Sequence, residues 1–428
     1  MASLARSLVD TIVKSSASEA TKLAAANDVQ AALGLGGDWT IGKVIYTVFG
    51  NLASKPANDP VWAGTAKQFA NQVAVAKYYT ETLKGDATQL AILQSVVART
   101  SDKSDVSSAA ALAALALNNE AGRIQDGYIS NATVFADADG DGVLDPGEIS
   151  TTSDGDGNFK LTGAIGNLVA TGGTDISTNL PHTTVLKAPA GATIVNPLTT
   201  LVSAVAETGV SVAQAQAQVA EKLGLPATVT LTSFDPLQVA GSATSTAAEK
   251  AAAVSVYRAS ALVANVLTQT AAAVAGASTT VKNADAANAA AASIAKLITT
   301  ARAPIDLSKA DTLKAILSES AKSTGSEAAV AKVVDQVSAV MASTNAEVVK
   351  VQTTGGDVVA ALQSVVRAQV VAQGSASVAI ANAVKSGEAG TIAASFSGAA
   401  LAAELNQASV GTIGRGIDAV VIPSVPSG

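Results

Sequence analysis

The sequence predicts an α+β protein that is mainly α-helical. Apolar residues recur at helical spacing up to about residue 124 and again from residue 196 onward. Between these stretches, apolar and polar residues alternate as they do in short β-strands. Hydrophobic residues make up 48% of the chain and aromatic residues only 3%, so its cores must be built from Ala, Val, Leu and Ile. Such small side chains suit closely packed helices and small β-modules.

These changes of periodicity divide the 428 residues into four segments. In order, we expect an N-terminal helical domain, a small antiparallel β-sandwich, a C-terminal Ala-rich helical bundle and a flexible tail. They span residues 1–124, 125–195, 196–410 and 411–428, respectively. The tail contains repeated glycines and prolines, which prevent it from forming one helix.

The N-terminal segment contains three stretches with apolar residues at helical spacing. They span residues 70–83, 88–97 and 104–117. Lys84-Gly85-Asp86 ends the first of them. Trp39 and Trp62 lie near breaks between helices, and we expect both to anchor the core rather than a ligand.

The central segment consists of short runs rich in Val, Ile, Thr and aromatic residues, separated by Gly and Pro. The predicted strands lie within residues 127–136, 149–161, 167–171, 174–177, 183–187 and 192–195. Short strands at this spacing are typical of a small antiparallel sandwich.

Helical spacing returns at Asn196 and continues almost to the end of the chain. Ser211 is a predicted N-cap, and Gly224 and Pro226 end the helix that it begins. The predicted helices span residues 196–205, 211–223, 246–274, 285–299, 308–318, 326–341, 357–372 and 377–385. We expect this bundle to have a structural role, with self-association or docking to a cell surface as its sharper alternative.

Composition excludes several classes of function. Acidic residues outnumber basic ones by 34 to 27, and no Lys/Arg run stands out, so we expect neither nucleic acid nor an anionic membrane as a partner. Cysteine is absent, which excludes disulfides and thiolate chemistry. His182 is the only histidine and precedes a predicted strand, where it is expected to be a polar turn residue. Without a second His or a Cys, zinc chemistry is not expected.

No transmembrane segment is predicted. The longest uncharged helical stretch, residues 259–281, is mostly alanine and includes Asn265 and Gln269. A membrane helix needs about 20 strongly apolar residues, so this stretch is expected to be a buried helix of a folded domain. The N-terminus lacks the apolar core and cleavage site of a classical signal peptide.

One acidic stretch of the central segment predicts a ligand. Counted from Asp137, carboxylates stand at positions 1, 3, 5, 9 and 12, a glycine at 6 and the carbonyl of Val143 at 7. This is the complete pattern of a calcium loop, because calcium takes about six to eight oxygens and alternate residues of a tight loop can all direct theirs inward. The predicted ligands are Asp137, Asp139, Asp141, Val143, Asp145 and Glu148.

Short strands, rather than helices, are predicted on both sides of this loop, so it is not a helix–loop–helix EF-hand. A second cluster follows, in which Asp154, Asp156 and Asn158 repeat the first three ligand positions. Three interpretations remain open for it: a second ion site, further ligands that complete the first site, or an ordinary turn rich in Asp, Gly and Asn.

Two resemblances bear on function. About a hundred residues of the N-terminal segment resemble a helical domain of unknown function found in large bacterial surface-layer and repeats-in-toxin proteins exported by type I secretion; the resemblance is carried by Phe49-Gly-Asn-Leu-Ala-Ser-Lys-Pro56, Trp62 and the helix around Tyr78-Tyr79. The resemblance implies an extracellular, calcium-associated surface protein. The chain departs from that group because it lacks the Gly-Gly-x-Gly-x-Asp calcium repeats.

Residues 129–161, with an Asp-rich loop between strands, resemble the B-type prealbumin-like modules of bacterial surface adhesins. By this resemblance Asp137, Asp139, Asp141, Asp145 and Glu148 would hold calcium, and the module would be a stalk or spacer rather than a catalyst.

We therefore expect an extracellular, calcium-binding structural or adhesive protein of a surface layer, fibre or biofilm matrix, and no enzymatic activity. Its expected partners are calcium and either further copies of the chain or a cell-surface polymer. The alternative is a secreted hydrolase, which would need a nucleophile with a base or paired carboxylates in a cleft. An intracellular calcium sensor would need a Met-rich groove between helices, and the chain contains only two Met.

Overall fold

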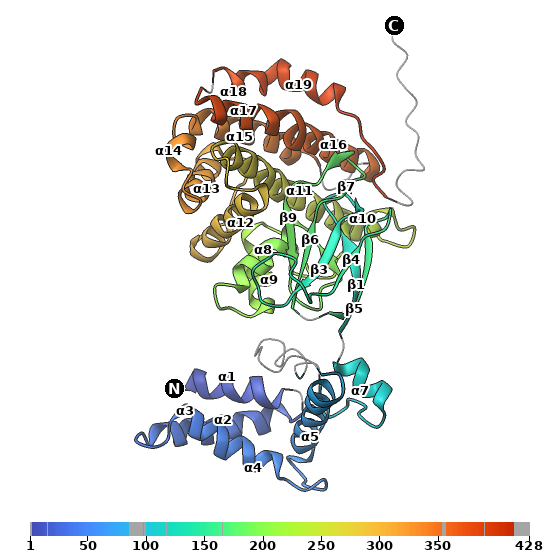
Figure 1. The fold of residues 1–428 in the computed structure, drawn as a ribbon, viewed down its shortest axis with the longest axis vertical. Coiled ribbons are helices and arrows are strands. Elements are labelled where there is room, and N and C mark those ends of the chain that lie inside the picture. The colour runs from blue at the N-terminus through green and yellow to red at the C-terminus, as the bar shows by residue number, and fades with distance from the viewer. Residues whose placement is uncertain are drawn as a thin grey trace. The chain divides into compact units, whose positions relative to one another are not determined.

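The computed structural model describes residues 2–14, 16–84, 97, 100–116, 118–164, 166–352, 357–388 and 390–414. As predicted, the protein is a mixed α+β fold that is mainly helical and contains small β-sheets (Figure 1). The chain divides into two compact units, Met1–Asn119 with Thr162–Gly166, and Glu120–Leu161 with Asn167–Gly428.

The first unit is built from helices around a small apolar core. Its helices are α1 (Ala2–Val13), α2 (Glu19–Gly34), α3 (Ile41–Val44), η1 (Ile45–Phe49), α4 (Gly50–Ala53), α5 (Ala63–Lys77), η2 (Tyr78–Thr82) and α7 (Ala109–Ala116). Val9, Val29 and Phe49 lie in its core, and both tryptophans pack against this cluster. The helix predicted at 70–83 is the end of α5 together with η2, whereas the one predicted at 88–97 falls almost wholly outside the described residues.

The N-terminal helical segment ends earlier than the sequence predicted. Residues 118–124, expected to be helical, form strand β1 (Asn118–Ile124). Arg123 and Ile124 pair in parallel with Ile194 and Val195 of β10 (Ile194–Val195). This pairing joins segments about seventy residues apart, so local spacing carries no sign of it and tertiary contacts override the local preference.

The strands of the described residues form small sheets, and all of them except the start of β1 and the end of β5 belong to the second unit. One sheet has the order β4-β3-β6-β9, a second β10-β1-β5 and a third β2-β7-β8. The four-stranded sheet is antiparallel throughout. The strands are β2 (Ile129–Ser130), β3 (Thr133–Asp137), β4 (Ser150–Thr152), β5 (Asn158–Ala164), β6 (Asn167–Thr171), β7 (Thr174–Asp175), β8 (Leu180–Pro181) and β9 (Val185–Ala188).

The four-stranded sheet positions the predicted calcium loop. Phe135 on β3 pairs with Val169 on β6, which pairs with Lys187 on β9, so these three side chains share one face. Phe135 and Val169 are buried there, and Ala284 at the start of helix α12 (Asn283–Thr300) packs against them. Asp137 lies two residues beyond Phe135 and therefore on the same face, at the end of β3.

Helices make up the rest of the second unit. They are α8 (Pro197–Ala206), α9 (Val212–Lys222), α10 (Pro236–Gly241), α11 (Ala247–Gly276), α12, α13 (Ala310–Ser323), α14 (Glu327–Val330), α15 (Val334–Lys350), α16 (Val358–Val371), η3 (Ala372–Ala376), α17 (Ser377–Ser386), α18 (Ile392–Ser395) and α19 (Gly398–Gln407). The predicted cap Ser211 accepts a hydrogen bond from the N–H of Gln214. The helices predicted at 357–372 and 377–385 are joined by the π-helical turn η3 rather than by a break.

The boundary predicted between residues 195 and 196 does not separate two compact units. Asn196 caps α8 directly after β10, and α8 packs against β9 as well as against α9 and α12. Leu198, Leu201 and Val202 of α8 are fully buried in the core of the bundle. Strands and bundle therefore share apolar contacts, and neither has a complete core without the other.

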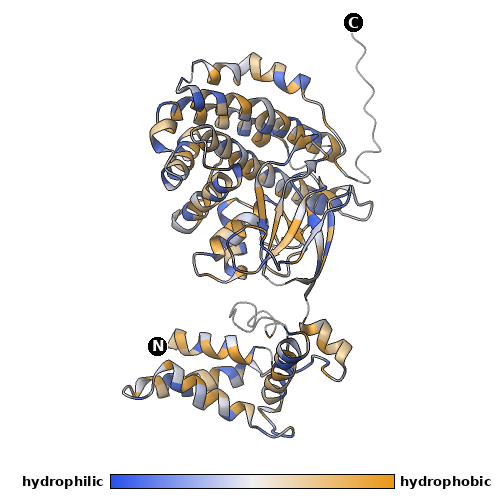
Figure 2. Ribbon diagram, viewed as in Figure 1, coloured by the Kyte–Doolittle hydropathy of each residue, from blue (hydrophilic) through white to orange (hydrophobic). Residues whose placement is uncertain are grey.

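Helix α11 is the central element of the bundle, in contact with α8, α10, α12, α15, α16 and α17. Among the described residues it is the one helix long and apolar enough to cross a membrane, judged by length and composition alone. Within its most apolar window, 67% of the residues are buried inside the protein. In Figure 2 the helices carry both hydrophilic and hydrophobic residues, whereas the strands are largely hydrophobic.

The beginning of the predicted flexible tail is held in place. The N–H groups of Gly411 and Thr412 donate to the carbonyls of Ser177 and Ile176, at 2.6 and 2.8 Å. Ile413 is 1% exposed. A Cβ at position 411 would lie 2.2 Å from the Ile176 carbonyl oxygen, so glycine is needed for this approach. The rest of the tail, from residue 415, lies outside the described residues.

Candidate metal centre

The predicted calcium loop connects β3 to β4 on the four-stranded sheet. Asp137 is the last residue of β3 and pairs with Asn167 on β6. The chain then turns through twelve residues and returns to pair with β3 from Ser150. Gly140 and Gly142 have φ values of +86° and +78°, a region that glycine adopts readily and other residues rarely do. The two glycines therefore allow the tight turn that brings alternate side chains together.

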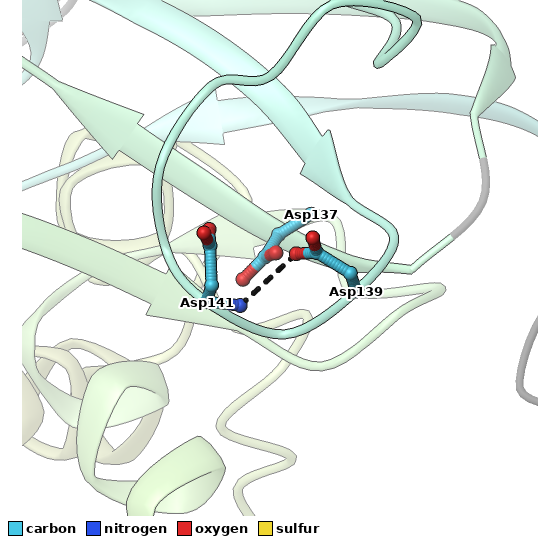
Figure 3. A group of neighbouring side chains, drawn as sticks. All are labelled: Asp137, Asp139 and Asp141. Carbon is cyan, nitrogen blue, oxygen red and sulfur yellow. Dashed lines mark hydrogen bonds between the residues drawn. The ribbon is translucent and has the colours of Figure 1, made fainter.

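Three of the predicted ligands converge (Figure 3). One carboxylate oxygen from each of Asp137, Asp139 and Asp141 lies within 4.8 Å of the others. Asp137 is 4% exposed, whereas Asp139 and Asp141 are exposed. Hard oxygen donors from alternate loop positions are what calcium requires, so this part of the donor set fits the ion.

Backbone amides hold these carboxylates within the loop. Asp137 accepts through Oδ1 from the N–H of Gly140 (2.9 Å) and through Oδ2 from that of Gly142 (3.0 Å). Asp141 accepts from the N–H of Val143 at 2.7 Å, and Asp139 from that of Asp141 at 3.2 Å. These hydrogen bonds join residues that are close in sequence, and they hold the three carboxylate groups in place independently of any ion.

Glu148, the predicted last ligand, also folds back onto the loop. Its Oε1 accepts from the N–H of Ala138 at 2.7 Å, and its Oε2 from that of Asp145 at 3.1 Å. The carboxylate therefore links the first and last parts of the loop. The side chains of Val143 and Asp145 are exposed, and neither belongs to the group of three converging aspartates.

Burial is the main influence on the pKa of the Asp137 carboxyl. Removal from water raises the pKa of its carboxyl, whereas the Gly140 and Gly142 amides and the charge of Lys187 oppose that rise. Lys187 comes from β9, two strands away in the sheet, so its position near the loop could not be predicted from local sequence. Its ammonium would be 3.3 Å from a Cβ placed on Gly142.

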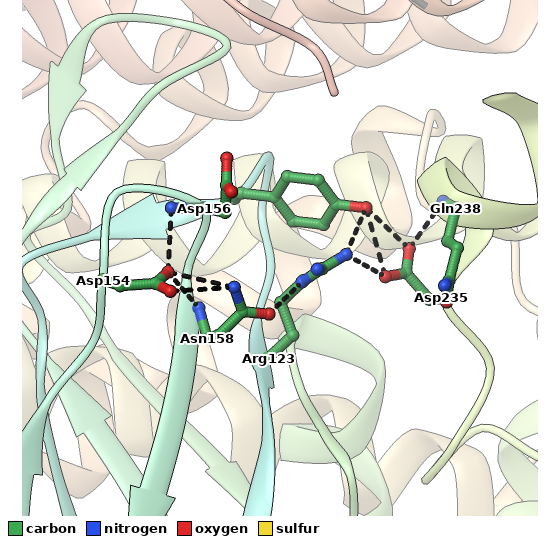
Figure 4. Close-up of polar contacts among 7 residues, drawn as sticks. Arg123, Asp154, Asp156, Asn158, Asp235 and Gln238 are labelled. Carbon is green, nitrogen blue, oxygen red and sulfur yellow. Dashed lines mark hydrogen bonds and ion pairs between the residues drawn. The ribbon is translucent and has the colours of Figure 1, made fainter. Parts of the chain in front are cut away.

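The second cluster is a hydrogen-bonded turn (Figure 4). Asp154 accepts from the N–H groups of Asp156 (2.9 Å) and Asn158 (2.8 Å), and from the Asn158 amide at 3.0 and 3.1 Å. Oδ1 of the same Asn158 amide accepts from Nε of Arg123 at 2.8 Å. Because the oxygen that Asn158 would offer to an ion is engaged by a guanidinium, this geometry favours the turn over a second ion site.

Arg123 links this turn to helix α10, because it contacts both Asn158 and Asp235. Its Nη1 lies 3.0 Å from the Tyr128 hydroxyl and 3.1 Å from Oδ2 of Asp235, and its guanidinium sits 4.5 Å from the centre of the Tyr128 ring. Asp235 also caps α10 through the N–H of Gln238. Sequence reasoning missed this network; the pair Asp235-Pro236, a typical start of a helix, was its only local signal.

Two further carboxylates, also missed from the sequence, are buried between strands and helices. Asp126 and Asp175 are each 2% exposed, and among the described residues neither forms an ion pair. Asp126 accepts from the amides of Gln369 (2.7 Å) and Gln373 (3.0 Å). Burial, reinforced by the neighbouring charge of Asp175, raises the pKa of Asp126 to about 8. Their surroundings in the sequence are ordinary turn residues, so nothing local marked them.

The hydrolase alternative would need a cleft with catalytic groups. A cavity of about 700 Å³ lies between α11, α12 and α17. Lys385 is the single charged residue among its described lining residues, which include neither carboxylate nor histidine. His182 is half-buried and contacts the Thr184 hydroxyl at 3.2 Å. The described lining of this cavity thus offers no carboxylate pair, whereas Glu347 and Asp357 both line a second cavity of about 460 Å³.

Comparisons of the chain with models of protein families, with curated proteins and with solved structures gave no match.

Proposed function

We propose that this protein binds calcium at the loop after β3 and that it is a structural or adhesive component of a cell surface. The convergence of Asp137, Asp139 and Asp141 from alternate positions of a glycine-containing loop carries the proposal. Calcium would be held by these three carboxylates, the Val143 carbonyl, Asp145 and Glu148. When bound, the ion would neutralise carboxylates that otherwise repel one another.

The loop supports the proposal in a second way. Asp137 and Glu148 are already held by backbone N–H groups at opposite ends of the twelve residues. A site whose end residues are held in place loses less conformational freedom when an ion binds. Calcium would therefore order the exposed middle of the loop, around Val143 and Asp145, rather than create the whole site.

We extend the proposal to the setting of the protein. The strands would form a small antiparallel sandwich of the kind found in the surface-adhesin modules that residues 129–161 resemble. Export by type I secretion would place the protein outside the cell, where calcium is abundant. Its partners there would be further copies of the chain or a cell-surface polymer. Labelling of the protein on intact cells tests the location, and protection from an added antibody or protease would contradict it.

Thermal unfolding with calcium or with a chelator tests the calcium site. Bound ion stabilises the folded unit by mass action, by about 2.7 kcal/mol at a hundredfold excess over the dissociation constant. Trp39 and Trp62 both lie in the first unit, so tryptophan fluorescence follows that unit separately. We expect calcium to raise the calorimetric transition of the second unit and to leave the tryptophan transition unchanged. Identical unfolding in calcium and chelator would contradict the proposal.

A further inference from the structure

Lys187 and Asp137 lie on the same face of the four-stranded sheet. Lys187 pairs with Val169, which pairs with Phe135, and side chains two residues apart on a strand share a face. Asp137, two residues after Phe135, therefore lies on the face that carries Lys187. The loop after Asp137 folds over the end of that face, within reach of the lysine.

The ammonium of Lys187 lies against the middle of the loop. A Cβ placed on Gly142 would be 3.3 Å from Nζ and 3.5 Å from Cε. Glycine at loop position 6 thus serves the sharp turn and also leaves room for the lysine. Among the described residues Lys187 forms no ion pair within 4.0 Å, so its charge is not neutralised by a single carboxylate.

The backbone of Lys187 is fixed by the start of α8. Its N–H donates to the Thr200 hydroxyl at 2.9 Å, and its carbonyl accepts from the Thr199 hydroxyl at 2.8 Å. Thr199 and Thr200 are 0% and 2% exposed. The base of the lysine is therefore held by buried groups, which keeps its side chain on the loop's side of the sheet.

A fixed positive charge beside a calcium loop has opposite effects on its two states. Without the ion, the charge offsets part of the repulsion among the loop carboxylates. With the ion, it repels a divalent cation and weakens binding. The position of its ammonium, 3.3 Å from a Cβ placed on Gly142, puts this charge beside the loop.

We infer that Lys187 is a built-in counter-cation of the loop and that it sets the calcium affinity by stabilising the ion-free state and destabilising the loaded one. This inference rests on the proposed calcium site. It assigns to a residue outside the loop the role of keeping the affinity low, so that the loop responds to changes at high calcium concentration.

The test compares Lys187→Met with Lys187→Arg, which keeps the charge, and with Lys160→Met. Lys160 is an exposed lysine of β5, in another sheet. Removing one charge near a divalent ion at low ionic strength should tighten calcium binding roughly three- to thirtyfold. The gain should shrink as salt is added, because the Debye length falls to about 10 Å at 0.1 M. The other two variants should bind calcium as the wild type does.

Melting curves separate this electrostatic role from a packing role. Lys187→Met should melt below the wild type in chelator and should show a larger upward shift when calcium is added. A packing role would lower both curves equally. Unchanged calcium affinity in Lys187→Met, while the wild type binds, would overturn the inference and leave the proposed function intact. A wild type that binds no calcium would overturn both.

Discussion

The amide of Gln369 donates to Oδ1 of Asp126 at 2.7 Å and so joins residues 243 positions apart in the sequence. Asp126 follows β1, whereas Gln369 lies near the end of α16. The Tyr257 hydroxyl of α11 donates to the same glutamine at 3.2 Å. Strands and bundle are therefore joined by buried hydrogen bonds as well as by apolar contacts, with a carboxyl group at the centre. Removing a partner from such a network leaves polar atoms unsatisfied.

The first prediction concerns pH. The folded-state pKa of Asp126, about 8, lies above its ordinary value of 3.8, so between these pH values the folded state keeps a proton that the unfolded state has released. The free energy of unfolding of the second unit should therefore fall as pH rises from about 4 to about 8, by up to about 1.4 kcal/mol per pH unit. Asparagine copies the neutral acid, so Asp126→Asn should flatten this dependence.

Denaturant titrations between pH 5 and pH 8 in calcium-free buffer provide the measurement. The neighbouring Asp175 is also buried, which raises the pKa of its carboxyl, so a residual slope of the same sign should remain in the variant. Asp28→Asn, at an exposed site on α2, serves as the matched control. Parallel pH profiles for the wild type and Asp126→Asn would contradict the account.

The second prediction concerns the network at Arg123. Asp235→Ala removes the cap of α10 and leaves Arg123 and the Tyr128 hydroxyl without their common acceptor. We expect a loss of about 1–3 kcal/mol in the free energy of unfolding of the second unit. Asp311→Ala, at an exposed site in the first turn of α13, should cost much less. Denaturant unfolding followed by circular dichroism measures both, and equal losses would be inconsistent with a buried network.

The third prediction concerns the second cluster. Asp154→Ala should lower stability, because it removes the acceptor that holds the turn at Asp156 and Asn158. It should leave the number of bound calcium ions unchanged. Equilibrium dialysis with calcium measures that number, and a loss of one ion per chain in the variant would show that the cluster is a second site.

The helices of the bundle could be predicted because their signals are local. Helix α11 was expected at residues 246–274 and spans Ala247–Gly276, with Thr246 as its cap. Its capping box and apolar spacing lie within one stretch of sequence. Short elements such as α10 and α19 were missed, and α14 and α15 were predicted as one helix, because elements of this kind depend on the packing around them.

In the candidate site, too, local features could be predicted from the sequence and distant partners could not. The loop ligands are contiguous, so their spacing alone indicated a calcium loop. Lys187 lies 45 positions after Gly142 and Asp235 lies 112 positions after Arg123, so neither partnership leaves a local trace. The strand β1 was missed for the same reason, since its partner β10 is distant in sequence. Pairings between distant segments are what a single sequence conceals.

The most direct test of the calcium site is a calorimetric titration of the full chain with calcium, alongside Asp139→Ala, Glu148→Ala and the control Asp28→Asn. We expect one site in the wild type and in the control, with a dissociation constant of about 10⁻⁴–10⁻³ M if the setting is extracellular. Magnesium should compete poorly, because it prefers a compact octahedron and retains its waters. Both loop variants should bind calcium at least tenfold more weakly while the first unit stays folded. Equal calcium uptake by the wild type and Glu148→Ala, or no uptake by the wild type, would contradict the central claim.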